Sequence, residues 1–174
     1  IVRVGNRGYT EGALYADERF AENVDGAKAA GLATGVYFFS QAVTPDEARE
    51  EADFVLGLLA GRPLDLPVAF DHEPVSDNAG RANRLTGPEL AACARAFCER
   101  IEQAGYDTLV YGNKRDIARF GGDDLDGRPV WFAEYDVAVP TGQFDFVMWQ
   151  YTSAGTVAGI STRVDLNIRF AAAG

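Results

Sequence analysis

Strand-like and helix-like segments alternate along the first two thirds of the chain, and this alternation restricts the fold more than any other feature. Hydrophobic spacing predicts strands at 1–4, 32–40, 66–70 and 108–111, and helices at 16–30, 44–61, 86–105 and 116–120. Two of the helices begin at a capping pattern, in which Thr44 precedes Glu47 and Thr86 precedes Glu89 by three positions. A strand that is followed by a helix and another strand forms a parallel sheet with helical crossovers. The sequence therefore predicts an α/β fold.

The last third of the chain has a different pattern. Strands are predicted at 129–133, 144–151 and 164–168, but no helical segment separates them. No internal repeat or low-complexity linker interrupts the 174 residues, and this length is sufficient for one domain with a substantial core. We therefore expect residues 1–174 to form a single domain whose last strands lack helices.

The charge balance excludes several classes of partner. The chain carries 16 Lys and Arg against 26 Asp and Glu, a formal net charge of −10 with its one His neutral. A surface this acidic disfavours binding to a polyanion such as nucleic acid. No apolar run approaches the roughly 20 residues that a membrane-spanning helix needs. We expect neither nucleic acid nor a membrane as a partner, and we expect a monomer.

Metal and cofactor chemistry has little support in the residue types present. One His and two Cys provide no cluster with the spacing of a zinc site. Cys93 and Cys98 lie five positions apart on one predicted helix, where a disulfide would require the helix to distort. Asp123 and Asp124 lie in a Gly-rich segment without the spacing of a calcium loop. We expect unpaired cysteines, no metal and no cofactor.

Two carboxylates follow the predicted strand at 66–70, at the edge where α/β folds place their sites. Asp71 and Glu73 are two positions apart, so they share a face, with Cα atoms about 7 Å apart. Such a pair suits glycosidic bond cleavage, in which one carboxyl group donates a proton and the other stabilises positive charge. The alternative is a pair that only caps a turn or contacts solvent. A further carboxylate, Asp165, lies on the last predicted strand, and the predicted catalytic residues are Glu73, Asp71 and Asp165.

His72 stands between these carboxylates and invites a catalytic interpretation. Its side chain is expected on the opposite sheet face, which favours a structural role beneath the site. A nucleophilic triad is excluded because this single His points away and no G-x-S-x-G turn is present.

Aromatic side chains near strand ends form a second candidate set. Sugar rings stack their C–H faces on aromatic rings, and their hydroxyl groups bind neighbouring polar side chains. Ordinary core packing is the alternative for each aromatic residue. The predicted substrate-binding residues are Tyr37, Tyr111, Trp131, Tyr135, Trp149 and Gln150.

Six segments in order along the chain resemble glycoside hydrolase family 25, the Chalaropsis-type or Cellosyl-like muramidases. The D-x-E motif alone is weak, but D-x-E followed by a WQYTSAG…GI…VDLN ending is specific. The matching segments are IVRVGNRGY (1–9), AGLATGVYFFSQA (30–42), LPVAFDHE (66–73), AGYDTLVYGN (104–113), VWFAEYD (130–136) and VMWQYTSAGTVAGISTRVDLN (147–167).

The resemblance implies hydrolysis of the β-1,4 bond between N-acetylmuramic acid and N-acetylglucosamine in peptidoglycan. It implies Glu73 as general acid, Asp71 as the residue assisting the substrate's 2-acetamido group, and Asp165 in the site wall. Tyr37, Tyr111, Trp131 and Gln150 match positions that line the groove. The implied fold is a TIM-like (β/α) barrel whose last strands lack helices. The implied location is extracellular, or release as a phage lysin.

Three alternatives stay open at this point. Family members begin with a strand bearing D-[IV]-S-x-x-Q-G, whereas this chain starts at the strand expected to be second. A barrel short of its first strand is therefore expected, and an inactive domain that binds cell-wall glycan is the alternative to an active muramidase. Substrate-assisted retention is the expected mechanism, with an inverting route or direct nucleophilic attack as the alternatives.

Overall fold

The structure, a computed structural model, describes residues 1–76, 79–121 and 125–170. In these residues eight strands form one sheet in the order β2-β1-β3-β4-β5-β6-β7-β8. The strands are β1 (Val2–Arg7), β2 (Leu14–Ala16), β3 (Val36–Phe39), β4 (Val68–Asp71), β5 (Thr108–Asn113), β6 (Val130–Ala133), β7 (Met148–Gly155) and β8 (Val164–Arg169). The helices are α1 (Phe20–Ala29), α2 (Pro45–Leu59), α3 (Gly87–Glu102) and α4 (Lys114–Arg119).

The centre of the sheet is parallel and its two edges are antiparallel. Strands β1 and β3 to β7 run parallel, while β2 pairs antiparallel with β1 and β8 pairs antiparallel with β7. Helices α1 to α4 connect the strands from β2 to β6, and no helix lies between β6 and β7 or between β7 and β8. The predicted α/β fold with helix-free last strands is confirmed. The short connections at the edges explain the antiparallel pairing, because a parallel pair needs a longer crossover.

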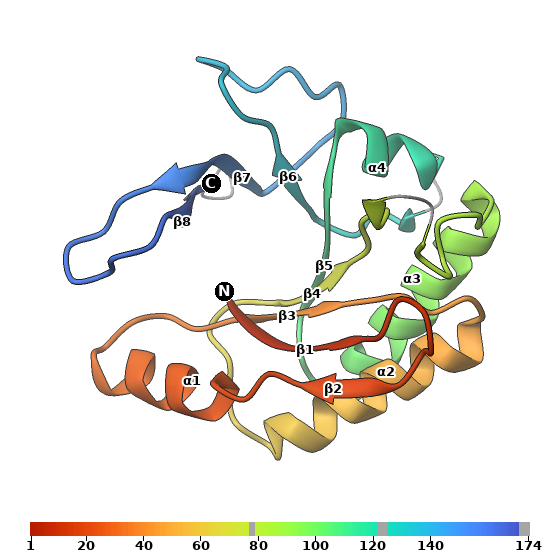
Figure 1. Cartoon of the computed structure of the whole chain (residues 1–174), viewed down its shortest axis with the longest axis horizontal. Helices are drawn as coiled ribbons and strands as arrows, with labels where there is room; N and C mark the ends of the chain where they lie inside the picture. Colours follow the sequence, from red (N-terminus) through yellow and green to blue (C-terminus); the bar gives the residue numbers. More distant parts are fainter. Residues whose placement is uncertain (77–78, 122–124, 171–174) are drawn as a thin grey trace.

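The expected barrel is not closed in this structure. A barrel requires hydrogen bonding to continue around the whole sheet, and the described strands leave β2 and β8 as two unpaired edges. The sheet does twist strongly: β1 and β3 run nearly horizontally in Figure 1, whereas β5 runs nearly vertically. The β7–β8 hairpin projects to the left in the same view, away from α2 and α3.

Some strand boundaries differ from those predicted, because certain hydrophobic residues pack in the core without belonging to a strand. The strand predicted at 144–151 begins only at Met148. Phe144 and Phe146 precede it and pack against Phe132, with ring centroids 5.0 and 5.4 Å apart. The strand β2 was absent from the prediction, since its three residues have no distinctive hydrophobic pattern. At the predicted helix starts, the Thr44 side chain accepts a hydrogen bond from the Glu47 N–H at 3.2 Å, and Glu89 accepts one from the Thr86 N–H at 2.9 Å.

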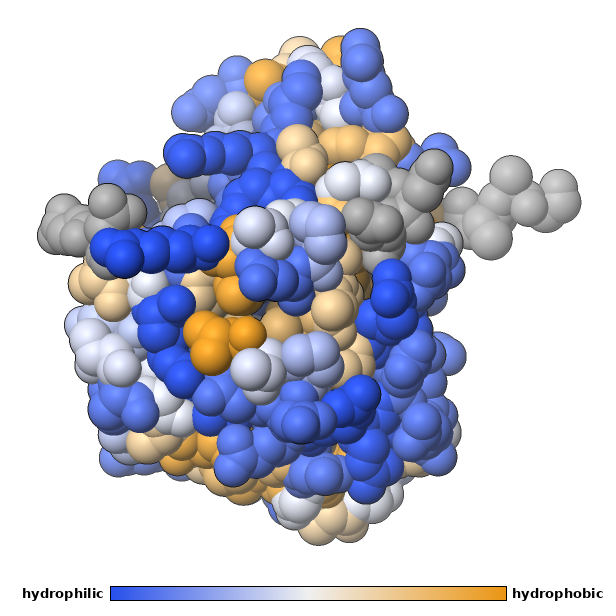
Figure 2. All heavy atoms as spheres, turned by 90° about the vertical axis from the view of Figure 1, so that its right-hand side faces the viewer, coloured by the Kyte–Doolittle hydropathy of each residue, from blue (hydrophilic) through white to orange (hydrophobic). Residues whose placement is uncertain are grey.

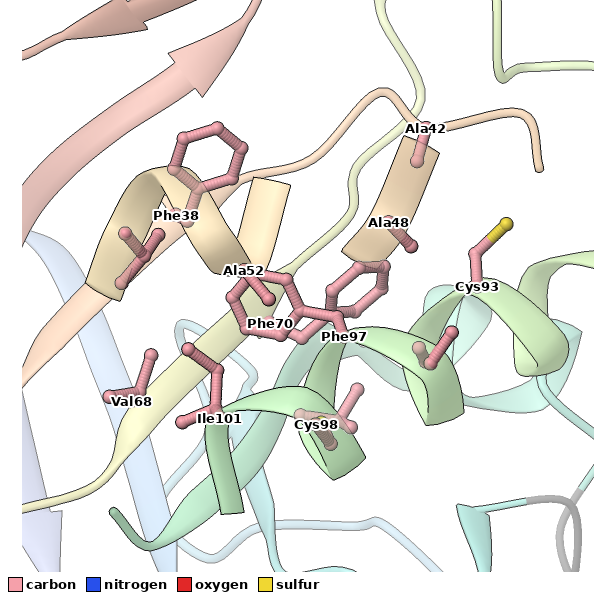
Figure 3. Packing of buried hydrophobic residues seen from close by; sticks show 14 of the residues in the cluster. Phe38, Ala42, Ala48, Ala52, Val68, Phe70, Cys93, Phe97, Cys98 and Ile101 are labelled. Carbon is pink, nitrogen blue, oxygen red and sulfur yellow. The ribbon is translucent and has the colours of Figure 1, made fainter. Parts of the chain in front are cut away.

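The two faces of the sheet bury different side chains. One face packs against the helices, where Phe97 of α3 lies 6.3 Å from Phe38 and 5.4 Å from Phe70 between ring centroids (Figure 3). Cys93 and Cys98 are buried as free thiols in the same layer. The other face carries a smaller cluster that consists of Ala69, Leu109, Tyr111, Trp131, Ala133 and Met148. Residues therefore alternate between the two faces along each strand, and the second face carries the candidate site.

The helices turn most of their polar residues outward. On the side of the molecule shown in Figure 2, hydrophilic residues cover most of the surface and hydrophobic residues form small, separate patches. Among the described residues, no helix has the length and apolar character needed to cross a membrane.

Candidate active site

Strand β4 positions two of the three predicted catalytic carboxylates. Val68 and Phe70 face the helices, and the alternation along the strand directs Asp71 and Glu73 to the opposite face. Asp71 is 5% exposed, whereas Glu73 is half-buried. The predicted pair is therefore brought together on one face of the sheet.

A small pocket is lined by residues of six strands, β3 to β8, and contains most of the predicted site residues. Its volume is about 80 Å³, and its wall consists of Tyr37, Asp71, Glu73, Tyr111, Trp131, Gln150 and Asp165. Asp165 reaches it from the beginning of β8, because β8 runs antiparallel to β7. Three carboxylates thus meet an aromatic and amide wall that comes from segments far apart in the sequence.

Hydrogen bonds fix the aromatic wall of this pocket. The Tyr111 hydroxyl donates to Oε1 of Gln150 at 2.8 Å, and the Tyr135 hydroxyl donates to the same oxygen. The Trp131 indole N–H donates to Oδ1 of Asn167 at 2.8 Å, and its ring lies edge-on to Tyr111 at 4.8 Å between centroids. With its oxygen held by two hydroxyl groups, Gln150 keeps its amide N–H donors for the pocket.

Trp149 is the one predicted site residue that lies elsewhere. It alternates with Gln150 along β7, so its side chain lies on the helix-facing side of the sheet. Its indole N–H donates to the Glu134 carbonyl at 2.9 Å, and its ring lies 5.8 Å from that of Tyr151. The structure thus does not place Trp149 with the other predicted binding residues. Tyr135 is 40% exposed and joins the site through Gln150.

Burial and neighbouring charges raise the pKa values of Glu73 and Asp71, so these two carboxyl groups stay protonated to higher pH. Burial raises the pKa of Glu73, and the charges of Asp116 and Asp165 raise it further. Burial also raises the pKa of Asp71 well above its usual value, with added contributions from Glu73 and Asp116. A carboxyl group that resists ionisation is suited to donate a proton near neutral pH.

His72 has the structural position expected from its place in the strand. It is 1% exposed, and its Nδ1 lies 3.2 Å from the Ser40 carbonyl oxygen. Burial lowers the pKa of His72 to about 4, so the ring is neutral near pH 7. A neutral ring has one N–H, and placing it on Nδ1 satisfies the Ser40 oxygen.

Larger hollows lie elsewhere and do not gather catalytic groups. One of about 530 Å³ lies at the opposite ends of the central strands, where its wall includes Pro67, Asp107 and Pro129. In the described part of the chain, no group of three or more His, Cys, Asp or Glu residues has an arrangement that could hold a metal ion. Asp123 and Asp124 lie outside the described residues.

Comparison with known proteins identifies the family. The sequence profile described as Glycosyl hydrolases family 25 matches residues 7–160 of the chain. The chain belongs to this family. The resemblance drawn from the sequence motifs is therefore confirmed.

Relatives of this family 25 chain carry names of lytic enzymes. An autolytic lysozyme of Clostridium acetobutylicum is 32% identical over 91% of the chain, and lysozyme M1 of Streptomyces globisporus is 26% identical over 91%. The CTP1L endolysin structure is 30% identical over 97% of the chain and 56% of its own length, with a TM-score of 0.75. The chain spans only 46% and 56% of the lengths of the two lysozymes.

A solved structure with lower identity shares the fold. The modular autolysin LytC of Streptococcus pneumoniae, solved with a synthetic peptidoglycan ligand, superposes with a TM-score of 0.82 at 23% identity. The match covers 97% of this chain and 40% of that one. The mixed α/β architecture of this family 25 chain is thus shared with solved relatives.

Two residues of the site were missed by sequence reasoning. Asp116 is 1% exposed, and its charge acts on both Asp71 and Glu73. It is the third residue of α4, where it accepts a hydrogen bond from the Asn113 N–H at 3.4 Å. The spacing of Asn113 and Asp116 directly after a predicted strand is a capping pattern that could have indicated it. Asn167, the partner of Trp131, belongs to the quoted VDLN segment but was not assigned a role.

Replacing Asp116 with Asn is expected to lower the pKa of Glu73. The substitution removes a negative charge that disfavours the ionised form of Glu73, and it keeps an oxygen that can accept from Asn113. The measurement is an NMR titration of the ¹³C-labelled Glu73 carboxyl group. The variant Asp145→Asn, at an exposed loop position, is the control and should leave the titration unchanged. An identical Glu73 titration in wild type and Asp116→Asn would contradict the electrostatic role of Asp116.

Proposed function

We propose that this family 25 chain is a peptidoglycan hydrolase that cleaves the β-1,4 bond between N-acetylmuramic acid and N-acetylglucosamine. The observation that carries the proposal is the Asp71–Glu73 pair, whose pKa values are both raised, facing an aromatic pocket with Asp165 and Gln150. The lysozyme and endolysin names of its relatives support the same activity.

Glu73 is the general acid in this proposal. Its carboxyl proton moves to the glycosidic oxygen as the bond to the anomeric carbon breaks, and the bonding electron pair stays on the leaving oxygen. The substrate's acetamido carbonyl oxygen forms a bond to the anomeric carbon from the other face. Water then opens the cyclic intermediate, and the Glu73 carboxylate accepts the proton of that water.

Asp71 assists the acetamido group. Burial and the neighbouring Glu73 raise its pKa in the free protein, so the pair keeps a proton to higher pH than isolated carboxyl groups do. Positive charge that develops on the acetamido group favours the ionised form of Asp71, which leaves the proton on Glu73 where the reaction needs it.

The remaining wall of the pocket binds the sugar. Tyr37, Tyr111 and Trp131 offer aromatic surface, and Gln150 offers amide N–H donors. Asp165 lies in the same wall and accepts hydrogen bonds from sugar hydroxyl groups. Tyr135 completes this set through its bond to Gln150.

The proposal extends to the organisation of the chain. Residues 1–174 form one catalytic domain that acts outside the cell, or on release as a phage lysin, as a monomer. The twisted sheet forms part of a TIM-like barrel wall. A glycan-binding domain without activity is disfavoured, because binding alone does not require a carboxyl group with a raised pKa beside Asp71.

The proposed activity predicts a specific product from purified bacterial peptidoglycan. We expect new reducing ends on N-acetylmuramic acid, identified by mass spectrometry after borohydride reduction, because the muramic acid side of the bond becomes the free end. Proton NMR of the first-formed product should show the β anomer, since the acetamido route retains configuration. Reducing ends on N-acetylglucosamine would contradict the bond assignment, and an initial α anomer would contradict retention.

A further inference from the structure

The segment Ser40–Gln41, directly after β3, makes one hydrogen bond to Asp71, the last residue of β4, and one to each of the two residues that follow it. The Ser40 N–H donates to the Asp71 carbonyl at 2.7 Å. The His72 ring meets the Ser40 carbonyl at 3.2 Å, and the Gln41 amide donates to the Glu73 carbonyl at 3.3 Å. This neighbouring segment thus holds three successive residues, Asp71 and Glu73 through their backbone carbonyls and His72 through its ring.

Gln41 is itself held by charged groups in the interior. Its N–H donates to Oε1 of Glu51 at 3.3 Å, and its carbonyl accepts from Arg81 at 3.3 Å. Oε1 of Glu51 also accepts from Nε of Arg7 at 2.8 Å. Glu51 and Gln41 are both fully buried, and Arg7 is 4% exposed. The contacts therefore connect β1, α2 and the end of β3 to the backbone of Glu73.

Stability alone does not account for the buried ion pair of Arg7 and Glu51. Removing two charges from water is costly, and apolar side chains of similar volume often stabilise a fold as well or better. Burial raises the pKa of Glu51 to about 7 in spite of the opposing effect of Arg7, which reflects that cost. The Gln41 Oε1 and Glu51 Oε2 atoms are also buried without a hydrogen-bond partner in the described structure. Such an arrangement is better explained by a requirement for geometry.

We propose that Gln41 and His72 are positioning residues for Glu73, and that the buried Arg7–Glu51 pair fixes Gln41 for this role. The inference rests on the proposed role of Glu73 as general acid. Gln41 acts on the Glu73 backbone, and His72 acts through Ser40. A displacement of about 1 Å at a reacting group can cost roughly 100-fold in rate, so small losses of alignment are measurable.

Two substitutions remove the contacts with little change in shape. Gln41→Met removes the donor to Glu73, and His72→Leu removes the donor to Ser40. We expect kcat on soluble uncross-linked glycan strands from peptidoglycan to fall about 10- to 100-fold, with KM within about twofold of wild type. His72→Asn should recover most of the activity, because its Nδ2 occupies nearly the position of the histidine Nδ1.

Two measurements separate positioning from general destabilisation. Leu59→Ala truncates a fully buried side chain at the end of α2, so it should lower Tm while kcat stays unchanged below the transition. If Gln41→Met does not fold, the double variant Arg7→Met/Glu51→Leu provides an apolar replacement of the pair and should show the same loss of kcat. An NMR titration of the Glu73 carboxyl group gives a second readout, and its pKa should move toward its ordinary value in Gln41→Met and His72→Leu but not in Leu59→Ala.

The outcomes distinguish the inference from the proposed function. Wild-type kcat and an unchanged Glu73 titration in the folded variants would overturn the positioning roles and leave the hydrolase intact. A wild-type protein that releases no reducing ends would overturn the hydrolase, while a shifted Glu73 titration in the variants would still support the positioning contacts.

Discussion

Replacing Glu73 with Gln is expected to reduce the release of reducing ends from peptidoglycan by about 100- to 10,000-fold, the range contributed by a general acid. The amide nearly matches the carboxyl group in size but has no acidic proton to give to the leaving oxygen. Glu73 is half-buried in the pocket wall, so the substitution should leave the fold in place and affect chemistry more than binding. Initial rates at saturating substrate, together with binding of glycan strands to the inactive variant, measure the two effects separately.

The control for this variant is another Glu to Gln exchange away from the pocket. Glu99 lies on the exposed side of α3, and Glu99→Gln should keep the wild-type rate. Undiminished activity of Glu73→Gln would remove Glu73 from the acid role. Loss of glycan binding with an unchanged rate per bound substrate would instead give Glu73 a binding role.

Replacing Asp71 with Asn is expected to lower activity about 100-fold and to stabilise the protein at pH 7. Activity falls because the amide cannot supply the negative charge that favours the developing positive charge on the acetamido group. Stability rises because Asp71 is 5% exposed and its Oδ1 has no hydrogen-bond partner in the described structure. We expect Tm to increase by roughly 2–4 °C, the shift that about 1 kcal/mol produces in a domain of this size.

The pH dependence of the free energy of unfolding tests whether the pKa of Asp71 is raised in the folded protein. Its pKa in the folded protein is raised, so the unfolded chain releases the proton first as pH increases from about 4. The free energy of unfolding should therefore fall as pH rises toward the folded pKa of Asp71 and then level off. In Asp71→Asn this decrease should be smaller. Urea unfolding at pH 4, 5.5 and 7 measures the difference.

An exposed Asp at the other end of the sheet is the matched control. Asp107→Asn, just before β5, should change neither activity nor the pH dependence of unfolding. Equal stability of wild type and Asp71→Asn at pH 7, with equal pH dependence, would show that the buried Asp71 carboxyl group does not destabilise the folded protein.

The pairing of Asp71 with Glu73 was predictable from the sequence because side chains in a strand alternate between two faces. The same rule placed His72 on the opposite face. Applied to β7 it also separates Trp149 from Gln150, and Trp149 was included only because aromatic residues near strand ends were treated as one set. The alternation along β7 was therefore sufficient to exclude Trp149 from the site, but the prediction for Trp149 did not apply it.

Contacts between distant segments were not accessible in this way. Asp116 acts on Glu73 across two neighbouring strands, and Glu51 meets Arg7 and Gln41 from a helix. Hydrophobic spacing predicts the structure of each segment separately. It does not predict which buried charged side chains from different segments contact one another. The antiparallel pairing of β8, which brings Asp165 into the pocket, depends on the direction of the returning chain and was likewise not predicted.

The sequence by itself determined the α/β class, the order of the helices and strands apart from β2, the family and the shared face of Asp71 and Glu73. These follow from local backbone periodicity and from motifs that are read along the chain. Only the tertiary structure decided which pocket wall these carboxylates face, how far their protonation is shifted, and that the described sheet is open between β2 and β8. The reason is physical: burial, charge coupling and strand closure depend on distances in space between segments far apart in the sequence.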